Sequence, residues 1–263
     1  MLKIKLKTKK IIKLNNNLNL KHIIVTGASS GLGRELSINL SKINCKLFLT
    51  GKNKIELLKT YKMLKGDNHK YFAFDLNNLN KLETLTSKMF ENDIQFDGFV
   101  HCAGMHNIFP LNLIEKKNLI ETYNINVFAP LLITKEFAKK NNHNINSSII
   151  YISSVSAFIG SSSLSLYSSS KAAQIGLMKS LAVELSKKKI RVNSISSSFF
   201  ESKIFNKIKS KIPKENLLQL NKKHLLGIGK YQDIIPTIIH LISDDSQWTT
   251  GSNLVIDGGY SSN

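Results

Sequence analysis

Tyr167 and Lys171 lie four residues apart in the stretch YSSSK, and apolar residues follow them at helical spacing from Ala172 to Leu185. On a helix, positions i and i+4 share one face, so both side chains can point into the same cleft. The phenol of a free tyrosine has a pKa of about 10 and exchanges protons poorly at neutral pH. A neighbouring ammonium favours the phenolate, so Lys171 is predicted to lower the pKa of Tyr167. The pair predicts general acid–base catalysis rather than the solvated linker that a serine tract alone suggests.

A glycine-rich turn, TGASSGLGREL, follows the apolar run His22–Gly27. Glycines allow positive φ angles and let backbone N–H groups approach a pyrophosphate at the start of a helix. The spacing departs from GxGxxG, but the turn follows the first predicted strand and opens the first predicted helix, as a dinucleotide site requires. The residues predicted to bind the cofactor here are Gly27, Ser29, Ser30, Gly31, Leu32 and Gly33.

The end of the second predicted strand indicates which cofactor binds. A carboxylate there binds the ribose 2′-hydroxyl of NAD, whereas a cation accommodates the 2′-phosphate of NADP. This chain has Gly51 in the position of the acid and Lys52 directly after it. The sequence therefore predicts NADP(H) in preference to NAD(H), with Lys52 as a cofactor-binding residue. The alternative is an ordinary exposed lysine in a lysine-rich chain.

Short apolar runs alternate with longer helical patterns along the chain, and these elements must position the turn and the pair. Continuous apolar strands separated by helices indicate a parallel sheet buried on both faces. With right-handed crossovers, the predicted fold is a single-domain α/β, Rossmann-like, doubly wound parallel sheet of about seven strands with helices on both faces. The predicted strands are His22–Gly27, Lys46–Gly51, Tyr71–Asp75, Phe96–Gly104, Ser147–Ser154, Ile190–Ser196 and Asn253–Gly259, and helices are predicted to begin near Leu32, Lys54, Asn78, Glu115, Leu166 and Tyr231.

The chain has 263 residues, which suit one large domain better than two small ones. Its formal net charge is +19, and all of its 37 basic residues except Arg34 and Arg191 are lysines spread along the chain. A nucleic-acid binder concentrates its basic residues on one element and interleaves aromatic residues, so the charge indicates biased residue usage and no nucleic-acid partner. Residues 1–20 lack the Arg and Ser of a transit peptide. They are predicted to form a basic, flexible arm before an NADP-binding domain at residues 21–263.

Cysteine content and hydropathy indicate the compartment. No apolar run approaches the length that spans a bilayer, and no cleavable signal pattern is visible. Cys45 and Cys102 give no disulfide framework and suit a reducing compartment. The sequence therefore predicts a cytoplasmic protein without a membrane span. No second cysteine lies near Cys102 in the sequence, and no metal site is predicted.

Six motifs occur in one order with regular spacing: TGASSGLG, NVFAP, YISSVSA, YSSSK, RVNSIS and GSNLVIDGGY. Together they resemble the short-chain dehydrogenase/reductase family over residues 21–261, and within it the 3-oxoacyl-acyl-carrier-protein reductases and related bacterial reductases. The resemblance implies NADPH-dependent reduction of a ketone to a secondary alcohol in fatty acid biosynthesis. The substrate would be a 3-oxoacyl thioester, as a small molecule or bound to acyl carrier protein. The alternatives are oxidoreduction of a sugar, polyol or other secondary alcohol, or a non-catalytic binding module that keeps the fold.

The resemblance also implies a role for each catalytic residue. Tyr167 is the general acid that gives a proton to the carbonyl oxygen. Lys171 acts on Tyr167 and hydrogen-bonds the nicotinamide ribose. Ser154 hydrogen-bonds the substrate carbonyl as negative charge develops there. Ser153 is the competing residue, but strand alternation points it to the opposite face.

Further positions carry over from the same resemblance. Asn126 matches the asparagine that helps to hold the lysine and a proton-relay water, and Asn124 in the same predicted helix is the alternative. Relatives are commonly homotetramers, and a homotetramer is expected here on that ground. The other implied cofactor-binding residues are Asp75 and Leu76 at the adenine, Ala103 and Gly104 after the fourth strand, and Ser202 in the loop beside the nicotinamide carboxamide.

The chain departs from the family pattern at three places. His101–Cys102 replace two asparagines, Ala129 replaces a glycine, and Ser197–Ser198 replace a Pro-Gly pair after the sixth strand. Losing Pro raises the entropy of the unfolded chain, and losing Gly strains a turn that needs positive φ, so the loop beside the nicotinamide is predicted to be looser. Residues 199–226 then match the mobile lid over the substrate, where apolar side chains could contact an aliphatic substrate or only pack the lid down.

Overall fold

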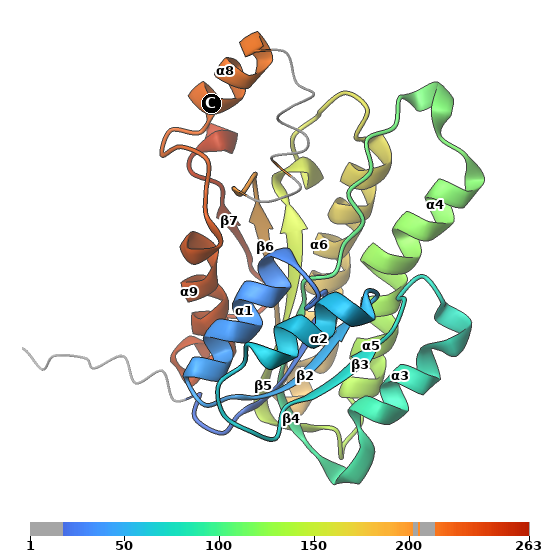
Figure 1. Ribbon diagram of the computed structural model, residues 1–263, viewed down its shortest axis with the longest axis vertical. Coiled ribbons are helices and arrows are strands. Elements are labelled where there is room, and N and C mark those ends of the chain that lie inside the picture. Colours follow the sequence, from blue (N-terminus) through green and yellow to red (C-terminus); the bar gives the residue numbers. More distant parts are fainter. Residues whose placement is uncertain (1–17, 202–204, 206–213, 263) are drawn as a thin grey trace, which may run out of the picture.

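The computed structural model of the chain describes residues 18–201, 205 and 214–262. Its centre is a sheet of seven parallel strands in the order β3-β2-β1-β4-β5-β6-β7, and helices pack against it (Figure 1). The predicted doubly wound sheet is thus confirmed. β1 and β4 are neighbours in the sheet although β2 and β3 lie between them in the sequence. The strand order therefore changes direction between β1 and β4. Where the order changes direction, a crevice opens outside the carboxyl ends of the two strands, and ligands bind there in such folds.

The strands keep close to their predicted positions. They are β1 (His22–Thr26), β2 (Lys46–Gly51), β3 (Lys70–Ala73), β4 (Phe96–His101), β5 (His143–Ser154), β6 (Arg191–Ser197) and β7 (Asn253–Ile256). β4 ends three residues earlier than predicted, since Ala103 turns its N–H to the hydroxyl of Thr26 at 3.3 Å. β7 also ends early, because Gly258 and Gly259 adopt positive φ angles of 62° and 83° and turn the chain.

The long helices are α1 (Gly31–Lys42), α2 (Lys54–Lys62), α3 (Leu82–Met89), α4 (Lys116–Tyr123), α5 (Ala129–Phe137), α6 (Ser165–Leu185), α8 (Lys214–Lys223) and α9 (Tyr231–Ile242). The six predicted helices begin within a residue of the predicted positions, except that a 3-10 turn precedes α3, and no helix start was predicted at α5. A π-helical turn, η4 (Asn124–Phe128), joins α4 to α5, and neither this turn nor α8 was predicted. Short 3-10 turns complete the structure: Leu79–Lys81, Glu91–Asp93, Leu111–Leu113, Val155–Ala157, Ser186–Lys188, Asp244–Ser246 and Tyr260–Ser262.

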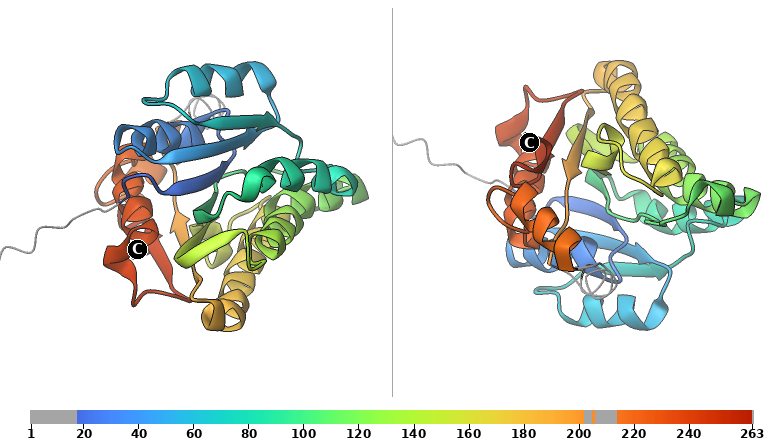
Figure 2. Two further views of the ribbon diagram at one scale, coloured as in Figure 1. Left: turned by 90° about the horizontal axis from the view of Figure 1, so that it is seen from below. Right: turned by 90° about the horizontal axis from the view of Figure 1, so that it is seen from above.

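The sheet is buried on both faces, as its continuous apolar strands predict. α1, α2 and α9 cover one face, and α3, α5 and α6 cover the other (Figure 2). Alternation along β1 divides the strand between the two cores: Ile24 packs with the second group of helices, whereas Ile23 and Val25 pack with the first. Leu18 is buried in the core on the face of α1, and its carbonyl accepts a hydrogen bond from Cys45 Sγ at 3.3 Å.

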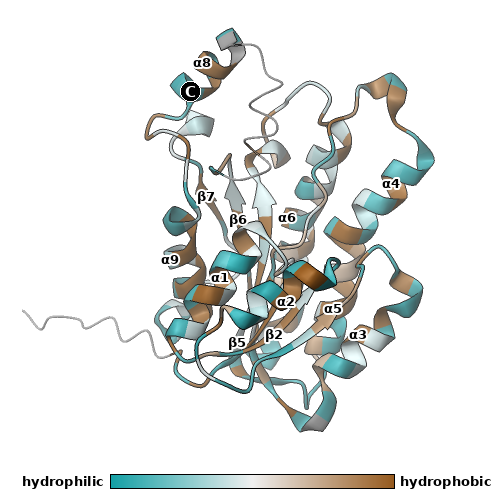
Figure 3. Ribbon diagram, in the orientation of Figure 1, coloured by the Kyte–Doolittle hydropathy of each residue, from teal (hydrophilic) through white to brown (hydrophobic). Residues whose placement is uncertain are grey.

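The carboxyl ends of β5 and β6 interrupt this apolar layer. Both strands end in serines, Ser153–Ser154 and Ser196–Ser197, and their tips are pale in Figure 3, where brown marks hydrophobic residues. Polar strand ends of this kind supply hydroxyl groups to the crevice above the sheet. Among residues 18–201 and 214–262, no helix has the length and apolar character needed to cross a bilayer.

Candidate active site

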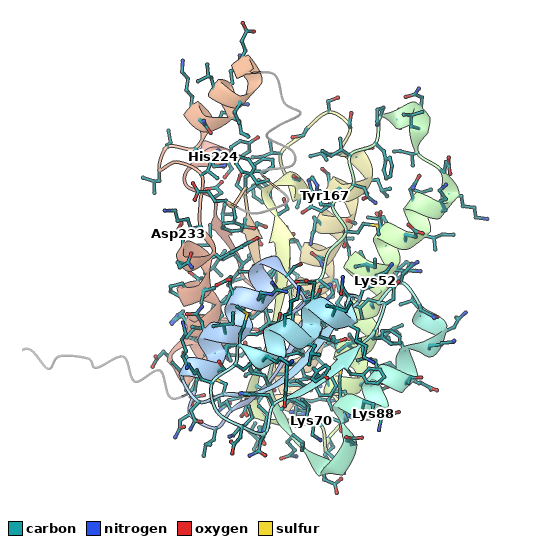
Figure 4. All side chains as sticks on the ribbon, viewed as in Figure 1. Lys52, Lys70, Lys88, Tyr167, His224 and Asp233 are labelled. Carbon is teal, nitrogen blue, oxygen red and sulfur yellow. The ribbon has the colours of Figure 1, made fainter. Side chains whose placement is uncertain are left out.

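A cavity of about 540 Å³ lies outside the carboxyl ends of the central strands. Tyr167, labelled in Figure 4, lies beside the end of the sheet toward which the strand arrows point. Ser154 lines a smaller adjoining cavity, Asn126 is fully buried in η4, and Ser202 lies outside the described residues. The structure brings the other predicted residues together in the wall of the larger cavity: Gly27, Ser29, Ser30, Gly31, Leu32, Gly33, Lys52, Asp75, Leu76, Ala103, Gly104, Tyr167 and Lys171.

The turn between β1 and α1 is packed too closely for side chains. Gly27 has a φ of +69°, and a Cβ there would lie 2.6 Å from the backbone nitrogen of Ala103. A Cβ on Gly33 would lie 2.7 Å from the carbonyl carbon of Gly27. Because these glycines bring the start of α1 against β4, backbone N–H groups are left facing the cavity at a helix N-terminus. This cradle fits the pyrophosphate of a dinucleotide.

Arg34 holds the same turn from behind. Its guanidinium donates to the carbonyl of Ser29 at 2.5 Å, to Glu56 Oε2 at 2.7 Å and to Thr60 Oγ1 at 2.9 Å. These contacts tie the turn to α2. The Arg34 and Lys59 contacts also lower the pKa of Glu56 to about 2, so its carboxylate is ionised at neutral pH.

Lys52 and Asp75 face each other at the far end of the cavity. Lys52 follows β2 directly, its side chain is 77% exposed, and its Nζ lies 2.8 Å from Asp75 Oδ2. The hydrogen bond to Asp75 raises the pKa of Lys52, which is therefore cationic. Gly51 beside it leaves no side chain at the end of β2, and a Cβ there would lie 3.0 Å from Ser29 Oγ.

Tyr167 and Ser154 meet at the opposite end. Both side chains line the same small cavity, and the His106 ring packs edge-on against Tyr167 with 4.5 Å between ring centroids. Burial raises the pKa of Tyr167 to about 12, and the Ser154 contact opposes that rise. The sequence predicted the opposite direction, and that prediction was wrong for this structure. Removing the phenol from water disfavours the phenolate, and this effect exceeds any influence of Lys171.

Lys171 is only 4% exposed, and its Nζ lies 5.8 Å from the centroid of the Tyr167 ring. The ammonium donates to the carbonyl of Ile152 at 2.7 Å. Burial lowers the pKa of Lys171 to about 8. Ser153 Oγ donates to the Lys171 carbonyl at 2.9 Å, so this serine supports the helix backbone and not the Tyr167 hydroxyl.

Asn126 uses its side chain to hold backbone. Its Oδ1 accepts from Met105 N at 2.8 Å, and its Nδ2 donates to Met105 O at 3.2 Å and to Ser170 Oγ at 2.9 Å. The Asn124 side chain instead donates to Asn77, at 3.1 Å to its carbonyl and at 3.0 Å to Oδ1. The side-chain hydrogen bonds of Asn126 go to Met105 and Ser170 and do not include Lys171. The residue that does link the two is Gln174, which the sequence analysis did not consider.

Ser197 and Ser198 do not strain the loop after β6. Neither serine is among the residues with positive φ. Ser197 extends β6 by pairing with Ser154 and Ile256, and Ser198 Oγ lies 2.7 Å from Nε2 of the buried His224. The predicted strain is therefore absent, because this loop does not need glycine. The Ser198–His224 contact was missed because its partners are far apart in the sequence.

Of the departures after β4, His101 is fully buried, whereas Cys102 is partly buried and lines the larger cavity. His101 Nδ1 lies 2.9 Å from Thr26 Oγ1, and burial lowers the pKa of His101 to about 3. Burial raises the pKa of Cys102 to about 12, so its thiol is inert at neutral pH. In the part of the chain that the structure describes, no three His, Cys, Asp or Glu side chains are grouped to hold a metal ion.

The smaller adjoining cavity, of about 150 Å³, shares Tyr167, His106 and Ser198 with the larger one. Its walls combine aromatic rings with a few polar groups and carry no carboxylate, lysine or arginine among the described residues. The lining residues are His106, Ser154, Val155, Ser156, Tyr167, Ser198, Phe199, Phe200, Phe205 and Tyr231.

Comparison with known proteins agrees with this arrangement. The profile of the family described as short chain dehydrogenase matches residues 21–213. The chain is 28% identical over 244 residues to the L-xylulose reductase of Caenorhabditis elegans, covering 92% of this chain and 96% of the relative. It is 29% identical over 239 residues to a 3-oxoacyl-[acyl-carrier-protein] reductase of Rickettsia prowazekii (strain Madrid E), covering 91% and 96%. A solved 4-hydroxyisoleucine dehydrogenase complexed with NADH is similar with a TM-score of 0.85 and 28% identity, covering 92% of this chain and 99% of that one.

Proposed function

The chain belongs to the short chain dehydrogenase family, and we propose that within it the protein is an NADPH-dependent reductase of 3-oxoacyl thioesters. Membership makes it an oxidoreductase that acts on alcohol or ketone groups. The observation that carries the proposal is that Tyr167 and Ser154 line one cavity beside the buried Lys171, next to a glycine-lined cradle for a dinucleotide.

In the proposed reaction, the substrate carbonyl receives a hydride from the cofactor and a proton from Tyr167. When bound, the reduced nicotinamide supplies a hydride to the carbonyl carbon. Tyr167 gives its phenolic proton to the carbonyl oxygen, so the product is a secondary alcohol. A pKa of about 12 keeps that proton on Tyr167 at neutral pH, which favours its use as an acid.

Ser154 stabilises the developing negative charge on the same oxygen. Its Oγ already accepts a hydrogen bond from the N–H of Ser156 at 3.1 Å. The hydroxyl proton of Ser154 is therefore available to donate toward Tyr167 or the substrate. Lys171 contributes a positive charge near the reacting oxygen as long as it stays protonated.

The proposed cofactor is NADP(H), with NAD(H) as the alternative. Lys52 is a cation at the carboxyl end of β2, and Gly51 leaves no carboxylate there to select a ribose 2′-hydroxyl. A 2′-phosphate would compete with Asp75 for Lys52. The similar 4-hydroxyisoleucine dehydrogenase was solved with NADH, and both cofactors therefore belong in the test.

The proposed substrate class follows from the smaller cavity. Aromatic side chains gain free energy by burying an aliphatic chain, whereas each hydroxyl of a sugar removed from water needs a polar partner. The wall offers rings from Phe199, Phe200, Phe205 and Tyr231. This composition favours an acyl chain over a polyol, although the similarity to an L-xylulose reductase keeps a sugar as the second candidate.

We also propose the cellular setting implied by that substrate. The protein would act in the cytoplasm in fatty acid biosynthesis, on a small-molecule thioester or on one bound to acyl carrier protein, and the free Cys45 and Cys102 support a reducing compartment. Exposed apolar side chains of Leu119, Ile120 and Phe128 along α4 and η4 support a homotetramer. The proposed arm is limited to the residues before Leu18, because Leu18 packs in the core and Leu20 N donates to Asn44 O, so the predicted boundary at residue 20 was too late. The reductase domain up to residue 263 and Ser202 as a nicotinamide contact belong to the same proposal.

Two measurements test the function. A fluorescence titration with NADPH and NADH gives the dissociation constant of each cofactor. Turnover of an acetoacetyl thioester and of xylulose then compares the substrate classes at equal concentrations. The proposal predicts tighter binding of NADPH and the higher kcat/KM for the thioester. A higher kcat/KM for xylulose would reassign the substrate, and failure to bind either cofactor would overturn the proposed site.

A further inference from the structure

Gln174 lies on α6 one helical turn after Lys171 and is fully buried. Its side-chain amide makes two hydrogen bonds. Oε1 accepts from Lys171 Nζ at 3.2 Å, and Nε2 donates to the backbone carbonyl of Asn126 at 2.6 Å. An ammonium can only donate and a carbonyl can only accept, so the two partners fix the orientation of the amide.

The carbonyl of Asn126 lacks its usual donor within its own helix. In an α-helix this carbonyl would accept from the N–H four residues later, but that residue is Pro130, which has no N–H. The π-helical turn η4 begins just before this point, with Ala129 N donating back to Asn124 O. Gln174 thus supplies a donor to a buried carbonyl that the proline leaves without its usual one.

Lys171 depends on neutral acceptors. Two of its ammonium protons go to the carbonyl of Ile152 and to Gln174 Oε1. The titratable groups that face it are Tyr167 on its own helix and His101, Cys102 and His106 at the end of β4 and in the loop beyond. No carboxylate is among them, so each neutral acceptor matters to the charged form of the lysine.

We propose that Gln174 is a positioning residue that fixes both the location and the protonation of Lys171 by bridging its ammonium to the carbonyl of Asn126. The bridge continues through the Asn126 side chain to the backbone of Met105, which lines the cofactor cavity next to Gly104. The side-chain amides of Gln174 and Asn126 therefore connect the lysine to the cavity wall formed after β4. This inference rests on the proposed role of Lys171 in catalysis.

Two substitutions distinguish the role of Gln174 as an acceptor for Lys171 from its role as a donor to Asn126. Gln174→Met keeps the length and volume of the side chain but removes both hydrogen bonds. Because the ammonium then loses an acceptor, Lys171 is expected to titrate at a lower pH. Gln174→Glu keeps an acceptor, adds a negative charge beside Lys171 and removes the donor to Asn126, so Lys171 is expected to titrate at a higher pH. A residue that only fills space would not produce shifts of opposite sign.

The direct test is a nitrogen-15 NMR titration of the Lys171 side chain in the cofactor-free full chain, which needs no substrate. The midpoint should fall in Gln174→Met and rise in Gln174→Glu. Ser169→Ala is the matched control, because Ser169 is exposed on the same helix and its hydroxyl donates to the carbonyl of Leu166. An unchanged midpoint in Gln174→Met would overturn the inference, because the charge added in Gln174→Glu raises the midpoint whatever the role of Gln174.

Kinetics separate this inference from the proposed function. In Gln174→Met, kcat should fall about tenfold or more, as expected for losing a hydrogen bond to a charged group, while KM for the ketone stays near the parent value. The alkaline limb of the pH–rate profile should move to lower pH in that variant. If Tyr167→Phe is inactive while Gln174→Met matches the parent, the inference about Gln174 fails and the proposed function stands. If Tyr167→Phe stays active, the proposed function fails, and the NMR titration still decides the role of Gln174.

Discussion

The cavity has a lysine at each end, and the two are held in opposite ways. Lys171 is 4% exposed and bonded to neutral oxygens, and burial lowers its pKa to about 8. The Lys52 side chain is 77% exposed and paired with Asp75, and that contact raises its pKa. Water and salt screen an exposed charge, whereas a buried charge depends on each fixed partner. The comparison indicates that substitutions at the buried end should have much larger effects than those at the exposed end.

Lys171→Met tests the buried end and should give the larger loss. The variant removes the positive charge near Tyr167 and the proposed contact with the nicotinamide ribose. Turnover should fall about 10²–10⁴-fold, the range for loss of acid–base assistance, and NADPH affinity should fall with it. Steady-state kinetics and a fluorescence titration with NADPH measure the two effects. Loss of turnover without any loss of affinity would contradict the ribose contact.

The same variant should change how stability depends on pH. The pKa of Lys171 is about 8 in the folded chain against 10.5 as the ordinary value, so between these pH values the unfolded state binds more protons. The free energy of unfolding contributed by Lys171 therefore rises with pH across this window, and the penalty is fully present below pH 8. Methionine does not titrate. Urea denaturation at pH 8 and pH 10.5 should show the parent gaining stability relative to Lys171→Met; a constant difference would contradict the burial of a charged lysine.

The glycine cradle between the two lysines is tested by a matched pair. In Gly33→Ala the new methyl meets the backbone of Gly27, which cannot move aside, and a loss of about 1–3 kcal/mol in the free energy of unfolding is expected. In Gly176→Ala the new methyl meets nothing within 4 Å on α6. Replacing this exposed helical glycine should stabilise the chain by about 0.5–1 kcal/mol. Urea denaturation of both variants checks the signs, and equal effects would mean that the turn is not closely packed.

Lys52→Asp tests the exposed end and should give a smaller effect than Lys171→Met. Losing a charge contact with the 2′-phosphate and adding a carboxylate should shift the preference between NADPH and NADH by about 1–2 kcal/mol, in favour of NADH. The ratio of the two kcat/KM values measures this shift. Parent protein that uses NADH and NADPH equally well would show that Lys52 does not select the cofactor.

The sequence predicted the fold well because its signals are local and repeated. Apolar runs, helical periodicity and a glycine turn after the first strand are enough to indicate a parallel sheet with a dinucleotide site at its carboxyl edge. The spacing of Tyr167 and Lys171 likewise predicts that they share a helix face. Site residues that end or follow strands, such as Ala103 and Gly104, come together because parallel strands end at one edge.

The features of the site that the sequence did not predict depend on tertiary packing. The direction of the Tyr167 pKa could not be predicted, because it depends on how much water the folded chain excludes. Gln174 resembles any polar residue on a helix until Lys171 and the Asn126 carbonyl are seen on either side of it. Pro130 in NVFAP was the available signal, since it removes the donor that the Asn126 carbonyl would otherwise use.

Tyr167→Phe is the most direct test of the proposed reaction, because it removes one oxygen and keeps the ring. NADPH consumption with an acetoacetyl thioester should fall about 10²–10⁴-fold in this variant, while the NADPH dissociation constant stays within a few-fold of the parent value. Ser169→Ala, a change in the same tract, should leave both quantities unchanged. A Tyr167→Phe variant that keeps most of the parent's reductase activity would contradict the assignment of Tyr167 as the proton donor.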